Sequence, residues 1–256
     1  MKKWMVAWGA LAFLLAGCTQ PPEQEKIVVI SAASSLIDVT EQLKEQFSAT
    51  YPDWELVFTY NSSSKLATQI RQGAEVDLFL SADLQVLEDL RHEDFIQHDI
   101  IPFAQNRLVV GSSNKSYKGE NVHELLKEYQ GQMVAGEPKS VPLGHYTKQW
   151  FKEAGLLESY TDRFIYAKDA RQVLYLESGN AELGVLYYSD AVRSEKLHWF
   201  TILPPLHEDI GYYAAILEES DNSEEAQAFI DFLLSEGSQQ LLQEYGFLSI
   251  SEELTE

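Results

Sequence analysis

The chain has 256 residues, and 45% of them are hydrophobic, which is enough for one large or two small packed domains rather than a disordered chain. Its formal net charge of −21 at pH 7 repels nucleic acid and anionic lipid, so we expect no nucleic-acid partner. The same charge gives no long-range attraction for a small anion. An anion site in this chain must therefore depend on local dipoles and hydrogen bonds.

Residues 1–17 have the pattern of a signal peptide. Lys2 and Lys3 precede an apolar stretch that ends in small residues just before Cys18. An apolar run of about 12 residues is too short to cross a bilayer as a helix, so a signal peptide is favoured over a permanent anchor helix. The sequence predicts an exported protein that loses this segment.

Cys18 is the only cysteine of the chain, so no disulfide can form within it. The sequence Leu-Ala-Gly-Cys that ends at this residue resembles the lipobox of bacterial lipoproteins, in which the cysteine is lipidated and becomes the first residue of the mature protein. The resemblance implies attachment of Cys18 to the outer face of the cell membrane. Residues 18–26 then form the lipidated cysteine and a polar tether.

From residue 27 onward, short β-branched runs alternate with stretches of helical periodicity. The first series predicts strands at 27–30, 55–60 and 76–80, and helices at 36–47, 65–72 and 84–91. The second series predicts strands at 108–110, 133–135, 164–166 and 182–186, and helices at 122–129, 146–154 and 170–178. A strand at 212–217 follows, and a long helical tail at 223–245 is expected to stop at Gly246.

This alternation predicts an α/β protein with two lobes, each a mainly parallel sheet flanked by helices. We find no repeat and no long linker between the two series, which argues against two independent domains joined by a flexible segment. Clefts between such lobes are common ligand sites.

Two hydroxyl-rich turns stand between a predicted strand and a predicted helix. They are Ser31-Ala32-Ala33-Ser34-Ser35 and Asn61-Ser62-Ser63-Ser64. Each turn has two interpretations, a plain helix cap at Ser35 or Ser63, or an anion site where free amide groups converge. Two consecutive turns of this kind would meet at the carboxyl edge of one sheet, where open α/β folds bind ligands.

Motifs of common enzymes and metal sites are missing from the sequence. It contains neither the G-x-S-x-G elbow of serine hydrolases nor the G-x-x-x-x-G-K-[ST] loop of nucleotide-binding proteins. The run His123 to Lys127 differs from the zinc motif H-E-x-x-H, because Lys127 stands where the second histidine is needed. We therefore expect no catalytic residues, no cofactor and no direct metal ligands.

Longer motifs resemble the periplasmic molybdate-binding protein family over nearly all of the mature chain. These motifs are Ser31–Leu36, Asn61–Ala67, Val76–Asp83, Gly136–Gly144, Asp169–Leu174, Leu183–Ala191 and Tyr245–Phe247. The resemblance implies the two-lobed periplasmic binding protein fold of type II. It also implies lobe one from residues 27–105 and 208–256, and lobe two from residues 106–207.

In that family, serine hydroxyls, main-chain amides and one tyrosine hydroxyl hold the oxyanion. Carried over to this sequence, the resemblance implies Ser35 and Ser63 as donors from lobe one. Leu143 and Ala170 would donate main-chain N–H groups from lobe two, and Tyr187 would donate its phenol. Leu143, and Tyr188 next to Tyr187, are bulkier than the residues usual at these positions in the family.

The resemblance therefore implies an extracytoplasmic lipoprotein that captures molybdate, and also tungstate, and delivers it to the permease and ATPase subunits of an ABC importer. We expect it to act as a monomer. Two alternatives stay open, a receptor for another ligand such as sulfate or an organic acid, and a surface hydrolase that uses one of the serines. A carboxylate receptor normally needs an arginine, which the serine turns do not offer, and a hydrolase needs a base that no motif provides.

Overall fold

The structure is a computed structural model that describes residues 26–96, 98–114, 116–117, 121–171, 181–195, 197–203 and 210–250. The predicted signal peptide, Cys18 and nearly all of the tether lie outside the described residues, as does the predicted helix 170–178 from residue 172 onward. None of the helices in the described ranges is long and apolar enough to cross a membrane.

The first sheet has five strands in the order β2-β1-β3-β10-β4. Their bounds are β1 Lys26–Ala33, β2 Trp54–Asn61, β3 Leu78–Ser81, β4 Ile101–Asn106 and β10 Ile210–Ile216. β1 pairs in parallel with β2 and β3, whereas β10 runs antiparallel to both β3 and β4. The predicted mainly parallel sheet is therefore confirmed, with β10 as its one reversed strand.

The second sheet also has five strands, in the order β7-β6-β8-β5-β9. Their bounds are β5 Leu108–Ser112, β6 Met133–Gly136, β7 Phe164–Ala167, β8 Leu183–Tyr187 and β9 Trp199–Ile202. β6 is parallel to β7 and β8, and β5 is antiparallel to β8 and β9. We call the first sheet with its helices lobe one, and the second sheet with its helices lobe two.

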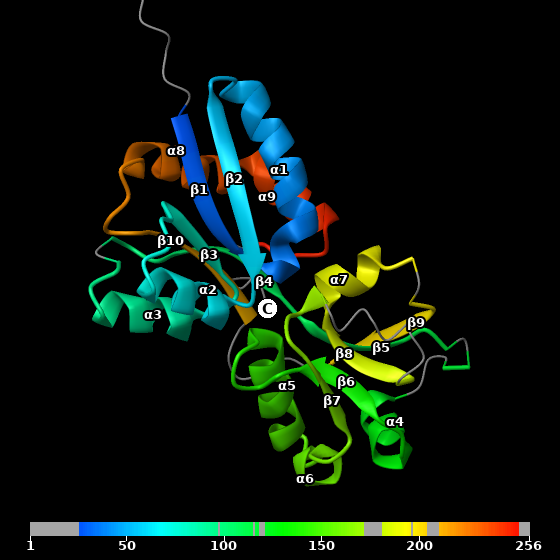
Figure 1. Cartoon of the computed structure of the whole chain (residues 1–256). Helices are drawn as coiled ribbons and strands as arrows, with labels where there is room; N and C mark the ends of the chain where they lie inside the picture. The colour runs from blue at the N-terminus through cyan, green and yellow to red at the C-terminus, as the bar shows by residue number, and fades with distance from the viewer. Residues whose placement is uncertain are drawn as a thin grey trace, which may run out of the picture.

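Helices cover both faces of the sheet in lobe one (Figure 1). They are the 3₁₀ helix Ser34–Leu36, α1 Ile37–Thr50, α2 Ser63–Arg71, α3 Leu84–His92, α8 Ser223–Leu233 and α9 Glu236–Glu244. Successive residues of a strand point to opposite faces of the sheet. Leu78 and Leu80 of β3 therefore enter the core with α1, α8 and α9, whereas Phe79 enters the core with α2 and α3.

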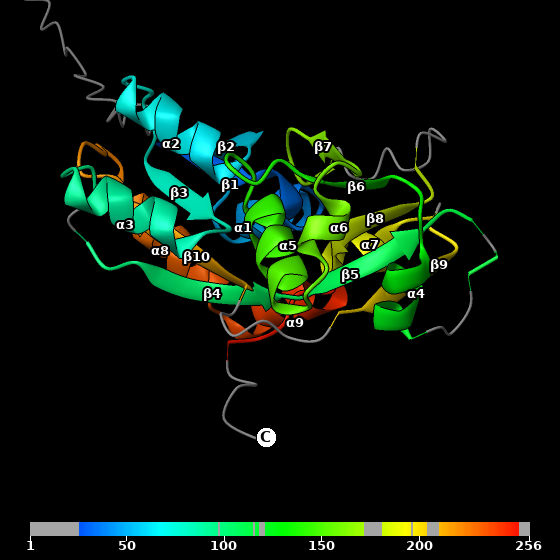
Figure 2. The same cartoon turned by 90° about the horizontal axis from the view of Figure 1, so that it is seen from below.

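Lobe two is smaller, and its buried apolar residues within the described ranges form a single core. Its helices are α4 Val122–Glu128, α5 Pro142–Glu153, α6 Leu157–Tyr160 and α7 Tyr188–Arg193. The view from below shows α5 near the centre of the molecule and α4 at the far end of lobe two (Figure 2), and Figure 1 shows α6 at the end of α5 that points away from lobe one. Phe151 of α5 and Tyr160 of α6 are fully buried in this core and meet edge to face, with ring centroids 4.8 Å apart.

Several elements differ from the predicted ones. β4 and β9 were not predicted, and both are edge strands, where Pro102 is tolerated in β4 because an edge strand has one unpaired side. Helix α5 begins at Pro142 rather than at residue 146, since proline fits the first turn of a helix. The predicted tail 223–245 is two helices, because the Ser235 hydroxyl accepts a hydrogen bond from the Ser238 amide and starts α9.

The predicted stop at Gly246 is confirmed. Gly246 has a φ of 84°, a conformation that glycine adopts without strain. Its amide donates to the Gln243 carbonyl, and the Phe247 amide donates to the Leu242 carbonyl, at 2.9 and 3.0 Å. These two bonds form a Schellman motif, which satisfies the last carbonyl groups of α9.

The lobes are joined at one place by a very short crossing. β4 ends at Asn106 and β5 begins at Leu108, so only Arg107 lies between the two sheets. In lobe one, β1 and β2 end side by side because Ala33 pairs with Asn61. The two hydroxyl-rich turns that follow these strands therefore meet at one edge of the sheet and face lobe two.

Candidate functional site

A small cavity lies between the lobes, at the carboxyl ends of β1 and β2. Eleven residues line it, Ala33, Ser34, Ser35, Ser62, Ser63, Ala82, Val141, Pro142, Leu143, Ala170 and Tyr187. Every one of them is buried. The centre of a water-sized sphere can occupy only about 10 Å³ of the cavity, so the space admits a few closely placed atoms and excludes a sugar or a peptide.

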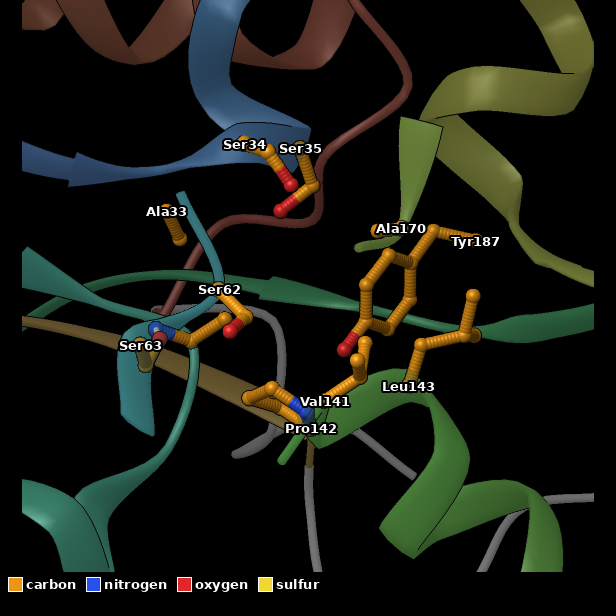
Figure 3. A pocket seen from close by; sticks show the side chains of 11 residues that line it. Ala33, Ser34, Ser35, Ser62, Ser63, Val141, Pro142, Leu143, Ala170 and Tyr187 are labelled. Carbon is orange, nitrogen blue, oxygen red and sulfur yellow. Dashed lines mark hydrogen bonds between the residues drawn. The ribbon is translucent and has the colours of Figure 1, made fainter. Parts of the chain in front are cut away.

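All five predicted site residues, Ser35, Ser63, Leu143, Ala170 and Tyr187, line this one cavity. Figure 3 shows that side chains from both lobes surround the same space, with the tyrosine ring facing the serine turns. The structure thus brings together residues that are up to 152 positions apart in the sequence.

The two predicted serines of lobe one each have a lone pair already occupied by a donor of the protein. The Ser35 Oγ accepts a hydrogen bond from the Tyr212 hydroxyl at 2.9 Å. The Ser63 Oγ accepts one from the Ala82 amide at 3.1 Å. Because a hydroxyl has one proton to donate, both serines keep that proton available for a ligand in the cavity.

Ser62 is a further hydroxyl of the site that sequence reasoning did not single out. Its Oγ is buried and has no hydrogen-bond partner among the described residues, and it points into the cavity (Figure 3). The only available signal was its position in the run Asn61-Ser62-Ser63-Ser64, where the resemblance assigned a role to Ser63 alone.

From lobe two, the Tyr187 hydroxyl faces the cavity as a hydrogen-bond donor. Its side chain is 1% exposed, and its hydroxyl has no hydrogen-bond partner within the described part of the chain. Burial raises the pKa of this phenol well above its ordinary value, so the hydroxyl stays protonated. A buried donor without an acceptor costs about 1–3 kcal/mol, which a ligand that accepts its hydrogen bond would recover.

Starts of helices also face the cavity. The first N–H groups of a helix have no partner within it and give that end a partial positive charge. Ser62 and Val141 are the N-cap residues of α2 and α5, and neither makes a side-chain capping hydrogen bond. Because Pro142 has no N–H, the Leu143 amide is the first donor of α5, while the Leu143 side chain belongs to the core of lobe two.

The capping interpretation of Ser35 is wrong. Ser35 lies inside the 3₁₀ helix Ser34–Leu36, and the residue that caps α1 is Leu36, without a side-chain hydrogen bond. The bulky Tyr188 does not narrow the cavity either. It begins α7, its ring packs edge to face on Phe200 with a centroid distance of 6.1 Å, and it is not among the lining residues.

No charged side chain is among the described residues that line the cavity. Charged groups instead connect the lobes beside it. The Arg171 Nη1 of lobe two donates to the Asp38 Oδ2 of lobe one at 2.5 Å. The Lys65 Nζ of lobe one donates to the Lys168 carbonyl oxygen of lobe two at 3.2 Å. These contacts join lobes that are already closed on the cavity.

The cavity lining therefore offers hydrogen-bond donors to an anion. Hydroxyl and amide donors line it, and the lining set contains no carboxylate or imidazole that could activate a serine. In the described ranges there is also no group of three or more histidine, cysteine, aspartate or glutamate side chains placed to hold a metal ion.

A buried carboxylate beside the site provides a pH-dependent prediction. Burial raises the pKa of Asp190 in α7 to about 7, although Arg171 acts to lower it. Between its ordinary pKa and 7 the folded protein holds a proton that the unfolded chain has released. This contribution to stability, on the order of 4 kcal/mol, is therefore complete below pH 4 and lost as the pH rises through 7.

We expect Asp190→Asn to remove this loss. The unfolding free energy of the variant, measured by urea denaturation, should exceed that of the unmodified protein more at pH 8 than at pH 5. Asp162→Asn, at an exposed turn after α6, is the matched control for removal of one carboxylate and is measured at the same two pH values. A difference between Asp190→Asn and the unmodified protein that is independent of pH would mean that Asp190 does not titrate in this range.

Comparison with known families identifies one match that covers most of the chain. The family model described as bacterial extracellular solute-binding protein matches residues 28–248. Two relatives extend over almost the whole length. The candidate ABC transporter substrate-binding lipoprotein YvgL of Bacillus subtilis is 31% identical, covering 96% of this chain and 98% of its own. The molybdate-binding protein ModA of Escherichia coli is 30% identical, with the same shares.

Solved structures give the same result for the fold. The substrate-binding domain of a candidate molybdenum ABC transporter from Clostridium difficile is 30% identical, with a TM-score of 0.69, and covers 88% of this chain and 99% of its own. The periplasmic molybdate-binding protein of Azotobacter vinelandii has a TM-score of 0.80 at 22% identity, over 86% and 98% of the two chains. These likenesses confirm the predicted two-lobed periplasmic binding protein fold.

Proposed function

Because the chain belongs to the family of bacterial extracellular solute-binding proteins, we propose that it captures molybdate between its two lobes and accepts tungstate as well. The observation that carries this proposal is a pair of buried hydroxyls that have no hydrogen-bond partner among the described residues, Ser62 Oγ and Tyr187 OH, which face one cavity from opposite lobes. Buried polar groups normally have partners. An oxyanion placed between the two hydroxyls would supply both.

The donors of the site fit a fully deprotonated tetrahedral oxyanion. We assign hydroxyl donation to Ser35, Ser63 and Tyr187, with Ser62 as a further hydroxyl donor, and main-chain N–H donation to Leu143 and Ala170. Hydrogen bonds to a charged group contribute about 1.5–3 kcal/mol each. Several of them are sufficient for micromolar or tighter binding, which is about −8 kcal/mol.

Relatives favour molybdate within this class of ligand. The ModA proteins named molybdate-binding are up to 30% identical to this chain over nearly its full length. Sulfate is also fully ionised, but it is smaller and would leave some hydrogen bonds too long. A hydrolase is disfavoured because no general base lies among the lining residues.

We further propose the setting in which the protein works. An ABC importer, with its permease and ATPase subunits, receives the ligand, since the relatives include substrate-binding proteins of ABC transporters. The protein is a monomer without catalytic activity and without a cofactor, and the lipidated Cys18 holds it at the outer face of the cell membrane. The YvgL relative is described as a lipoprotein, which supports the anchor.

Calorimetric titration of the purified protein with molybdate, tungstate, sulfate and phosphate tests the function. We expect molybdate and tungstate to bind with micromolar or lower dissociation constants, and phosphate to bind far more weakly. Tight binding of sulfate or phosphate with no heat from molybdate would overturn the assignment. An assay of ester and phosphoester hydrolysis on the same sample should give no rate above background.

A further inference from the structure

A chain of three buried polar side chains connects the crossing between the lobes to the cavity. Asn106, at the end of β4, donates from Nδ2 to the Tyr212 hydroxyl at 3.3 Å. Tyr212, in β10, donates from its hydroxyl to the Ser35 Oγ at 2.9 Å. Asn106 and Ser35 are 5% and 6% exposed, and Tyr212 is fully buried, so water does not compete for these bonds.

The direction of donation is fixed at Asn106. The Asn106 Oδ1 accepts hydrogen bonds from the main-chain amides of Arg107 and Ser189, at 2.9 and 3.4 Å. Main-chain amides can only donate, so the oxygen of the Asn106 side chain must face them. The Nδ2 must then face the opposite way, where it donates to the Ser189 Oγ at 2.9 Å and to Tyr212.

The direction of hydrogen-bond donation is also determined at Tyr212. Burial raises the pKa of its phenol, so the hydroxyl keeps its proton. Its oxygen already accepts from Asn106, and the acceptor of its proton in the described part of the chain is the Ser35 Oγ. Were Ser35 to turn its own proton toward Tyr212, the buried phenolic proton would lose its acceptor, at a cost of about 1–3 kcal/mol.

The proton of Ser35 is therefore directed into the cavity. We propose that Asn106 and Tyr212 are positioning residues for specificity, because they make Ser35 an obligatory donor and so select oxyanions that carry no proton. This inference rests on the proposed function, since it concerns the ligand of the same site. A hydrogen phosphate would present its own proton to a hydroxyl whose proton already points at the ligand. Ser35 could accept that proton on its second lone pair only by turning its own proton away from the ligand.

The proposal can be tested by reversing the direction of the hydrogen bonds that link Asn106, Tyr212 and Ser35. Asn106→Asp replaces the amide donor with a second acceptor oxygen of nearly the same shape. The main-chain amides of Arg107 and Ser189 and the hydroxyls of Ser189 and Tyr212 are all placed to donate to the new carboxylate. Tyr212 then donates away from the cavity, so that Ser35 can donate to Tyr212 and accept from the ligand.

The measurement is the ratio of the dissociation constants of inorganic phosphate and molybdate at pH 7. We expect Asn106→Asp to lower this ratio by at least about tenfold, since one unfavourable contact becomes a hydrogen bond. The added charge alone would also weaken both anions, so the same substitution is made in a Tyr212→Phe background. There the carboxylate is present but cannot act on Ser35, and the ratio should change less than about threefold.

Each outcome has a clear meaning. An equal change of the ratio in both backgrounds would show that charge alone is responsible and would overturn the proposal, as would an unchanged ratio in Asn106→Asp. If Asn106→Asp fails to fold, Tyr212→Phe provides the test. Loss of the donor to Ser35 should weaken molybdate binding about fivefold. Unchanged affinity for molybdate in Tyr212→Phe would refute the proposed role of the Asn106–Tyr212–Ser35 hydrogen bonds. Absence of molybdate binding by the unmodified protein would overturn the proposed function itself.

Discussion

Tyr187→Phe is expected to weaken binding of molybdate by about 10- to 150-fold, the loss of one hydrogen bond to a charged ligand worth about 1.5–3 kcal/mol. The phenolic hydroxyl is the one donor from a lobe-two side chain in the cavity lining, and it has no partner among the described residues. Removal of a buried, unpaired hydroxyl should leave the ligand-free protein as stable as before or slightly more stable. Calorimetric titration and thermal unfolding together measure both effects.

The next residue provides the matched control. Tyr188→Phe makes the same chemical change one position along the chain, but this ring packs on Phe200 and does not line the cavity. We expect an affinity within about twofold of the unmodified protein, since no donor to the ligand is lost. Unaltered affinity in Tyr187→Phe, or equal losses in both variants, would contradict the assignment of Tyr187 as a ligand donor.

Gly144→Ala is expected to destabilise the fold by about 1–3 kcal/mol and to weaken molybdate binding as well. A Cβ on Gly144 would lie 2.3 Å from the Gly136 carbonyl oxygen and 2.7 Å from the Glu137 carbonyl carbon. Both are backbone atoms, so the first turn of α5 must move away from the end of β6. The Leu143 amide belongs to that turn and would move with it. Urea denaturation and calorimetry measure the two losses.

Gly237→Ala is the control, and its expected change in stability is opposite to that of Gly144→Ala. Gly237 lies in the first turn of α9, and a Cβ there would meet no atom within 4 Å. Alanine is favoured over glycine in a helix by up to about 1 kcal/mol, so this variant should be more stable than the unmodified protein and should bind molybdate equally well. Equal stability of Gly144→Ala and Gly237→Ala would mean that the contact between α5 and β6 is not tight.

Most of the fold could be predicted because its central strands are continuous apolar runs. Leu78 to Leu80 are fully buried on both faces of the sheet, and this leaves a clear signal in the sequence. The two unpredicted strands, β4 and β9, lie at sheet edges. The proline in β4 also argues against a strand when only the sequence is considered. Their positions depend on pairing with distant strands, which local periodicity does not encode.

The site residues likewise include some that the sequence could predict and some that it could not. The serines follow predicted strands, so their meeting at one edge could be derived from the parallel order of β1 and β2, which pair up to Ala33 and Asn61. Leu143, Ala170 and Tyr187 came from the family resemblance alone. Tyr212 and Asn106 had no signal, because their role arises from hydrogen bonds between residues 106 and 177 positions apart.

The burial of every wall of the cavity determines how fast a ligand can leave. Lobe one provides the serine turns and lobe two provides Leu143, Ala170 and Tyr187, so separation of the two halves would take the cavity apart. We therefore expect the dissociation rate of a captured ion to follow the rate at which the two halves separate. Contacts beside the cavity, such as Arg171 with Asp38, would slow release without touching the ion, and a transporter that pulls the halves apart would empty the site whatever its equilibrium affinity.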